Sequence, residues 1–188
     1  TQFFTAIYAM AFFETDIEQL LDVGLASVDP TSRFYEVIQT TRLMVAENPN
    51  DWRKMRRLLK DRYSKHNGEL RDRNGYELNG AATVAALLYG QGDLSESLRL
   101  AFNFGWDADN SAASVGTILG IMKGYQWMED QGWKVKDVYY NITRLNMPLN
   151  ETLTGFADRL THLAVKTLVE EGKATVHESR QGKTYTYK

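Results

Sequence analysis

The run of small and apolar residues after Asp109 most constrains how this chain can fold. Gly116, Gly120 and Gly124 are spaced four apart, so on a helix they lie nearly one above another. Each glycine costs a helix up to about 1 kcal/mol relative to alanine, so we interpret the stripe as a place where a neighbouring backbone packs closely. Lys123 interrupts the run, which excludes a membrane dimer motif. The run therefore predicts a helix-rich core.

The rest of the chain is also typical of helices. Its 188 residues include only three prolines, and apolar residues recur at helical spacing over most of the length. The predicted fold class is therefore all-α, a compact multi-helix bundle. Phe3–Phe13 predicts a buried first helix, and residues 154–171 predict a last helix with Leu160 and Leu163 turned inward. The absence of cysteine excludes a disulfide framework, a thiolate metal site and a cysteine nucleophile.

The C-terminal residues have a different pattern. Ala174–His177 and Thr184–Tyr187 alternate apolar and polar residues and flank a turn at Gln181-Gly182. This pattern predicts a small β-hairpin, or the first strands of a further segment. We accordingly expect a helical domain over residues 1–172 and the hairpin or further segment over residues 173–188.

Two carboxylates and a carboxamide, Asp107, Asp109 and Asn110, stand directly before the small-residue run. Residues two apart do not share a face of a regular helix, so the two carboxylates converge only where a loop enters the helix. We expect the helix to begin near Asp109 or Asn110, because both are good N-caps. Adjacent carboxylates repel each other unless a positive charge separates them, and hard divalent cations prefer oxygen ligands. A helix cap with one spare acid and a metal site are both consistent with this pattern.

Charge and the remaining motifs limit the partners. The net charge of −2 favours no nucleic-acid partner, and no transmembrane run is visible. Residues 51–73 are rich in Lys and Arg, but acids are interspersed, so we interpret them as the solvated face of a helix. The histidines are scattered without ligand spacing, and there is no phosphate-binding glycine loop. We expect neither nucleic acid nor membrane as a partner.

The segment Gly105–Ala113, followed by the glycine-rich helix, resembles the C-terminal metal motif of the ADP-ribosylglycohydrolase family. Phe4–Phe13, Asp16–Glu18 and Val28–Arg33 are similar to the family's mid-chain helices and the turn between them. The likeness covers roughly residues 1–130. It implies an orthogonal helical bundle of the family's type and a binuclear Mg²⁺ or Mn²⁺ centre. The implied reaction is hydrolysis of the glycosidic bond that links ADP-ribose to a protein side chain, or of a related ADP-ribosyl compound.

The resemblance also implies roles for individual residues. Asp107 and Asp109 correspond to metal ligands, and Asn110 stands where the family usually has Thr, Ser or another small residue. Asn110 would bind a cation through its side-chain oxygen. Gly105-Trp106 replaces a common Gly-Gly, so Trp106 would narrow the mouth of the site, and we expect both residues to contact substrate.

Other parts of the family pattern are absent from this sequence. The family's Thr-Asp-Asp run and catalytic Glu lie in its N-terminal half and have no match here, so the catalytic residue is not assigned. On this interpretation the chain is the C-terminal half of a longer enzyme, or one piece of a cleaved one, and an N-terminal half is an expected partner. The other expected partner is an ADP-ribosylated protein or a small ADP-ribosyl ligand. Two alternatives remain: an inactive member that serves as a binding or structural protein, and a hydrolase of a different ribosyl substrate.

Overall fold

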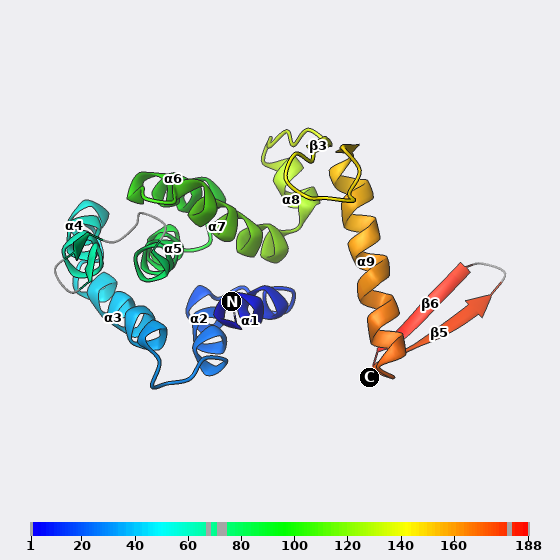
Figure 1. Cartoon of the computed structure of the whole chain (residues 1–188), viewed down its shortest axis with the longest axis horizontal. Helices are drawn as coiled ribbons and strands as arrows, with labels where there is room; N and C mark the ends of the chain where they lie inside the picture. The colour runs from blue at the N-terminus through cyan, green and yellow to red at the C-terminus, as the bar shows by residue number, and fades with distance from the viewer. Residues whose placement is uncertain (1, 67–68, 71–74, 180–181, 188) are drawn as a thin grey trace. The chain divides into compact units, whose positions relative to one another are not determined.

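The computed structural model describes residues 2–66, 69–70, 75–179 and 182–187. The chain divides into two compact units, Thr1–Trp133 and Lys134–Lys188. The helices, labelled in Figure 1, are α1 Gln2–Met10, α2 Ile17–Ala26, α3 Arg33–Glu47, α4 Trp52–Tyr63, α5 Tyr76–Gly90, α6 Leu94–Phe104, α7 Ala108–Lys123, α8 Tyr125–Asp130 and α9 Leu153–Glu170. The strands are β1 Lys65–His66, β2 Glu69–Leu70, β3 Tyr139–Tyr140, β4 Asn150–Glu151, β5 Ala174–Ser179 and β6 Gly182–Tyr187.

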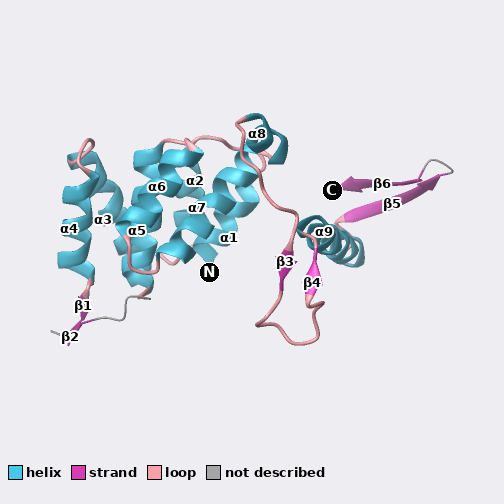
Figure 2. Ribbon diagram, turned by 90° about the horizontal axis from the view of Figure 1, so that it is seen from above, coloured by secondary structure: helices cyan, strands magenta, loops and turns pink. Residues whose placement is uncertain are grey.

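Helices make up most of the described residues, which confirms the all-α fold class (Figure 2). The strands form three separate antiparallel pairs, β1–β2, β3–β4 and β5–β6. The last pair confirms the predicted C-terminal hairpin, with a register that runs from Ala174 opposite Tyr187 to Ser179 opposite Gly182. Its predicted turn residue Gln181 lies outside the described residues. The boundary expected after residue 172 falls inside the second unit, between α9 and this hairpin.

Helix α5 is the centre of the first unit. It contacts α3 and α4 on one side and α6 and α7 on the other, as Figures 1 and 2 both show. An alanine-rich helix that is apolar on all sides is stable only when neighbours cover every face. Every residue from Gly80 to Leu87 is buried, in agreement with that rule. Helix α5 therefore fixes the positions of the helices that carry the candidate site.

Short polar side chains begin several of these helices. The side chain of Asp16 accepts a hydrogen bond from the backbone N–H of Glu18 at 2.8 Å, and that of Asp93 accepts one from Glu96 at 2.7 Å. Ser32 caps α3 in the same way. Such caps satisfy backbone donors that have no partner inside the helix, and they fix where each helix starts.

The first helix is shorter than Phe3–Phe13. Helix α1 ends at Met10, and Phe13 is 84% exposed, so the prediction of a buried helix is wrong for its last turn. The reason is local. The backbone N–H of Glu14 bonds to the Met10 carbonyl, and the Glu14 carboxylate accepts from the N–H groups of Thr15 and Asp16. These bonds turn the chain toward the start of α2.

The glycine stripe on α7 does not pack as predicted. A methyl group added at Gly116 would make an ordinary contact with Leu98, and one added at Gly120 would meet nothing within 4 Å among the described residues. Gly124 has a φ of +80° and separates α7 from α8, so it does not lie on the same helix as Gly116 and Gly120. The interpretation of the stripe as a close-packing surface is therefore wrong at Gly120 and Gly124.

Close backbone approach occurs on α5 instead. A methyl group at Gly80 would lie 2.6 Å from the ring of Phe34, and one at Gly90 would lie 1.9 Å from Ser97 Oγ. Neither position has room for a side chain unless its neighbour moves. These two glycines therefore allow α3 and α6 to pack against α5 at the observed distance.

Helix α9 contrasts with α5. None of its residues is buried, and Leu160 and Leu163 are exposed, so the prediction that they turn inward is wrong. In the second unit, the other described elements are short strand pairs, which cover little of an 18-residue helix. None of the helices in the described ranges has both the length and the apolar character needed to cross a membrane.

Candidate functional site

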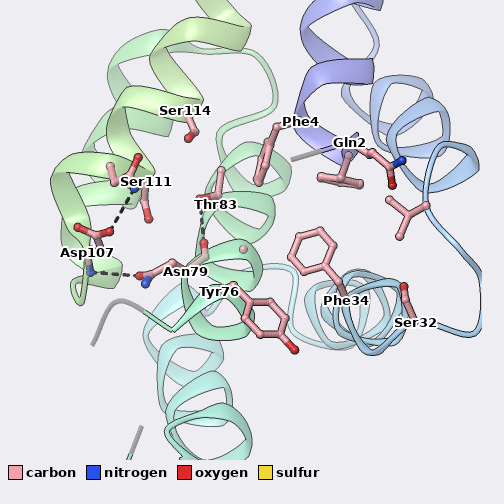
Figure 3. A pocket seen from close by; sticks show the side chains of 14 residues that line it. Gln2, Phe4, Ser32, Phe34, Tyr76, Asn79, Thr83, Asp107, Ser111 and Ser114 are labelled. Atoms are coloured by element: carbon pink, nitrogen blue, oxygen red, sulfur yellow. Dashed lines mark hydrogen bonds between the residues drawn. The ribbon is translucent and has the colours of Figure 1, made fainter. Parts of the chain in front are cut away.

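A cavity of about 580 Å³ lies in the first unit, between the start of α7 and the helices α1, α3 and α5 (Figure 3). Among the described residues, its lining combines aromatic and polar side chains and includes neither Lys nor Arg. The described residues that line it are Gln2, Phe3, Phe4, Val28, Ser32, Phe34, Tyr76, Asn79, Gly80, Thr83, Asp107, Asn110, Ser111 and Ser114.

One side of the cavity, which we call the polar wall, consists of Asp107, Asn110, Ser111 and Ser114. These residues are three, four and seven positions apart, so they occupy one face of α7. In Figure 3 the labelled members of this wall lie together, across the cavity from Phe34 and Ser32. A single helix thus presents a carboxylate, a carboxamide and two hydroxyl groups to the same space.

Asp107 is the N-cap of α7, so the helix begins at Ala108 rather than near Asp109 or Asn110. Unlike the cap of α6, its carboxylate accepts no hydrogen bond from the described backbone of the first turn. Instead, Asp107 Oδ2 accepts from Asn110 Nδ2 at 3.2 Å. The Asp107 carboxylate therefore remains available to the cavity, with the Asn110 amide beside it.

Asn79 connects the start of α5 to the start of α7. The backbone N–H of Asp107 donates to Asn79 Oδ1 at 3.1 Å (Figure 3). Asn79 Nδ2 donates to the Gly75 carbonyl at 3.1 Å. The Thr83 hydroxyl donates to the Asn79 carbonyl at 2.8 Å. Because each of these groups has a partner, the turn that carries Asp107 is held at a fixed position against α5.

The opposite side, which we call the aromatic wall, consists of Phe4, Phe34 and Tyr76, from α1, α3 and α5 respectively. The ring centroids of Phe34 and Tyr76 are 6.1 Å apart. Aromatic faces of this kind stack on flat apolar rings. Phe34 reaches this position because Gly80 leaves space for its ring against α5.

A buried carboxylate supports the aromatic wall from behind. Glu77 is 2% exposed, and its Oε1 accepts from the Tyr76 hydroxyl at 3.2 Å and from Arg33 Nε at 3.3 Å. The hydrogen bond from Arg33 to Glu36 raises the pKa of the Arg33 guanidinium, and Glu77 adds to this rise. Arg33 is therefore charged at every working pH, and it compensates the buried Glu77.

The structure separates the two predicted carboxylate ligands. Asp107 is half-buried and lines the cavity, whereas Asp109 is exposed and is not among the lining residues. Within the described ranges, no three His, Cys, Asp or Glu side chains cluster closely enough to hold a metal ion. Asn110 lies beside Asp107 on the polar wall. The convergence of Asp107 and Asp109 on a metal stays a prediction.

Gly105 and Trp106 form a strained turn just outside this lining. Their φ angles are +82° and +61°, in the left-handed region that glycine adopts readily and that residues with a Cβ atom, such as Trp106, adopt at an energetic cost. Arg56 holds the turn, because its Nε donates to the Phe104 carbonyl at 2.7 Å and its guanidinium lies 5.0 Å from the centre of the Trp106 ring. The contact of Gly105 and Trp106 with substrate stays a prediction.

Sequence reasoning did not select several lining residues. Ser111 and Ser114 had an available signal, because they lie four and seven residues after Asp107, at positions that share its helix face. No comparable signal in the sequence marks Asn79 or the three residues of the aromatic wall, since they come from helices that only tertiary packing brings to the cavity.

The sequence was compared with protein-family models, curated proteins and solved structures. A family model described as ADP-ribosylglycohydrolase matches residues 1–168. Comparison with curated proteins and with solved structures gave no match. The match spans the whole first unit and most of α9, so it includes both walls of the cavity. The chain therefore belongs to the ADP-ribosylglycohydrolase family, a family of glycosyl hydrolases.

Proposed function

We propose that this protein is a metal-dependent hydrolase that cleaves the glycosidic bond between ADP-ribose and a protein side chain, or that of a related ADP-ribosyl compound. Membership of a glycosyl hydrolase family supports hydrolysis of this bond type. One observation carries the proposal for this chain: the cavity places the Asp107 carboxylate and the rest of the polar wall opposite the aromatic wall. Such a lining suits a ligand that joins a polyhydroxyl sugar to a flat ring.

The donor atoms of the polar wall fit a hard divalent cation. Asp107 and Asn110 supply a carboxylate and an amide oxygen, which are the ligand types that Mg²⁺ and Mn²⁺ prefer. Asn110 Nδ2 already donates to Asp107 Oδ2, so the amide group keeps the carboxylate oriented. Two residues supply only part of an octahedral shell, and we assign the remaining positions to water and substrate oxygens. Asp109, which is exposed, joins the shell only if the first turn of α7 rearranges.

Different residues of the chain would then have different roles in the reaction. A bound cation of this kind lowers the pKa of a water molecule and orients sugar hydroxyls. Asp107 and Asn110 would hold the cation at the polar wall. Asn79 holds Asp107 in place, because its side-chain oxygen accepts the hydrogen bond from the Asp107 backbone N–H. Phe34 and Tyr76 would stack on the adenine ring and so position the sugar at the polar wall.

The test is release of ADP-ribose from an ADP-ribosylated protein by the purified chain, alone and assembled with the expected N-terminal half, in the presence of Mg²⁺, of Mn²⁺ and of a chelator. We expect release only with metal, and we expect Asp107→Asn to lower the rate by more than roughly 100-fold, because the charged ligand is lost. Asp61→Asn is the matched control, since Asp61 is an exposed acid on α4 outside the cavity. Equal release in the presence of the chelator would contradict metal dependence.

The same assay separates the alternatives. Tight binding of ADP-ribose without release from any substrate would identify a binding protein. Cleavage of another ribosyl compound, with every ADP-ribosylated substrate left intact, would identify a hydrolase of a different ribosyl substrate. Both outcomes would contradict the proposed activity on protein side chains.

A further inference from the structure

The hydroxyl group of Ser111 is a feature of the polar wall to which the roles assigned above give no function. Ser111 is 2% exposed, and its Oγ has no hydrogen-bond partner among the described residues. It lines the cavity next to Asn110 and one turn beyond Asp107. A buried hydroxyl without a partner keeps its full desolvation cost, so such groups call for an explanation.

Three other hydroxyl groups in helices of this protein have a partner in their own helix. Thr41, Thr83 and Thr117 each donate to the backbone carbonyl four residues earlier, at 2.7 to 2.8 Å. This bond is the usual way for a helical hydroxyl to be satisfied without a ligand. In contrast, the carbonyl four residues before Ser111, that of Asp107, accepts only the backbone N–H of Ser111 in the described structure.

Two other buried hydroxyls, those of Tyr63 and Ser97, also have no partner among the described residues. Neither residue lines the cavity. Ser97 is enclosed by close packing, since a methyl group at Gly90 would lie 1.9 Å from its Oγ. Ser97 therefore has no space for a ligand beside it, whereas Ser111 borders a cavity of about 580 Å³.

We propose that Ser111 is a further substrate-binding residue, whose hydroxyl hydrogen-bonds a hydroxyl group of the ribosyl unit next to the bond that is cleaved. This proposal rests on the proposed function. A serine hydroxyl both donates and accepts, which matches a sugar hydroxyl. Serine side chains also change rotamer, which lets the hydroxyl turn toward a bound sugar.

The charge of the cavity favours the sugar over the diphosphate as the group beside Ser111. The described lining contains the Asp107 carboxylate and no Lys or Arg. Diphosphate oxygens need several donors of positive charge, and the described lining supplies none apart from the cation proposed at Asp107 and Asn110. Neutral sugar hydroxyls pair with neutral groups such as the Ser111 hydroxyl, so the polar wall near Ser111 fits the ribosyl unit.

The experiment is calorimetric titration of the full chain with ADP-ribose and, separately, with ADP, which lacks the terminal ribose. We expect Ser111→Ala to weaken ADP-ribose binding by about 3- to 10-fold, the typical effect of one hydrogen bond, and to leave ADP binding unchanged. The unfolding midpoint of Ser111→Ala should equal or exceed that of the wild type, because the hydroxyl bonds to none of the described residues. Ser97→Ala is the matched control and should bind both ligands as the wild type does.

Three results would overturn the proposal. The first is wild-type affinity of Ser111→Ala for ADP-ribose. The second is an equal loss of affinity for ADP-ribose and ADP, and the third is an equal loss in Ser97→Ala. Failure of the proposed function is recognised separately: if the wild type binds ADP-ribose in a Ser111-dependent manner but releases none from modified protein, the binding role of Ser111 holds and the hydrolase does not.

Discussion

The two walls of the cavity are built in different ways. The polar wall comes from one face of α7, where the helical repeat alone brings Asp107, Asn110, Ser111 and Ser114 together. The aromatic wall comes from α1, α3 and α5, which meet only through tertiary packing. Changes in the polar wall should therefore affect chemistry and binding with little loss of stability. Changes that affect the aromatic wall should lower stability and binding together.

The largest expected effect concerns the two predicted carboxylate ligands, Asp107 and Asp109. Asp107→Ala should lower metal-dependent ADP-ribose release by more than roughly 100-fold, with an unfolding midpoint near that of the wild type, because the Asp107 carboxylate makes no cap bond. Asp109→Ala should have a comparable effect if Asp109 joins the metal on binding. Activity assays and metal titrations measure both. An Asp109→Ala variant that keeps both metal affinity and rate would remove Asp109 from the predicted ligands.

The second prediction compares two helical glycines. Gly80→Ala should lower the free energy of unfolding by about 1 to 3 kcal/mol and weaken ADP-ribose binding, because its methyl group displaces Phe34 from the aromatic wall. Gly120→Ala should raise the free energy of unfolding by about 0.5 to 1 kcal/mol, since the added methyl group meets none of the described residues within 4 Å. Denaturant unfolding measures both variants. Equal destabilisation by the two would contradict the described packing.

The third prediction tests the link between the walls. Asn79→Ala removes the acceptor for the Asp107 backbone N–H, and we expect turnover to fall about 10-fold and stability to fall by about 1 kcal/mol. Asn79→Asp keeps an acceptor at this position but loses the donor to the Gly75 carbonyl. Its turnover should lie between those of the wild type and Asn79→Ala. If Asn79→Ala lowers stability but keeps full turnover, Asn79 does not position Asp107.

The smallest expected effect concerns Trp106, which lies outside the described cavity lining. As a predicted substrate contact, Trp106→Ala should weaken ADP-ribose binding about threefold and lower stability by about 1 kcal/mol. Arg56→Gln should lower stability without changing affinity, because Arg56 holds the turn through the Phe104 carbonyl. Calorimetry and thermal unfolding separate the two effects. If Trp106→Ala leaves the affinity for ADP-ribose unchanged, Trp106 contributes to packing and not to substrate binding.

The sequence predicted the features that depend on neighbouring residues. Ser32 and Asp93 belong to the residue types that favour helix N-caps, and their side chains accept hydrogen bonds from backbone N–H groups three residues later. The C-terminal hairpin followed from alternation and a turn signal. The sequence also identified Asp107 as a candidate site residue. Ser111 follows it by four residues, a spacing that places both on one helix face. All these features are set by the repeat of a helix or a strand, which the sequence carries directly.

Tertiary structure decided what depends on neighbours far along the chain. The glycines of α7 suggested close packing, but close approach occurs at Gly80 and Gly90, where α3 and α6 cross α5. The leucines of α9 have a helical stripe without a partner helix in the described second unit. A periodic pattern specifies a face, but it does not specify what covers that face. For the same reason the sequence located Asp107, and only the packing of α1, α3 and α5 placed an aromatic wall opposite it.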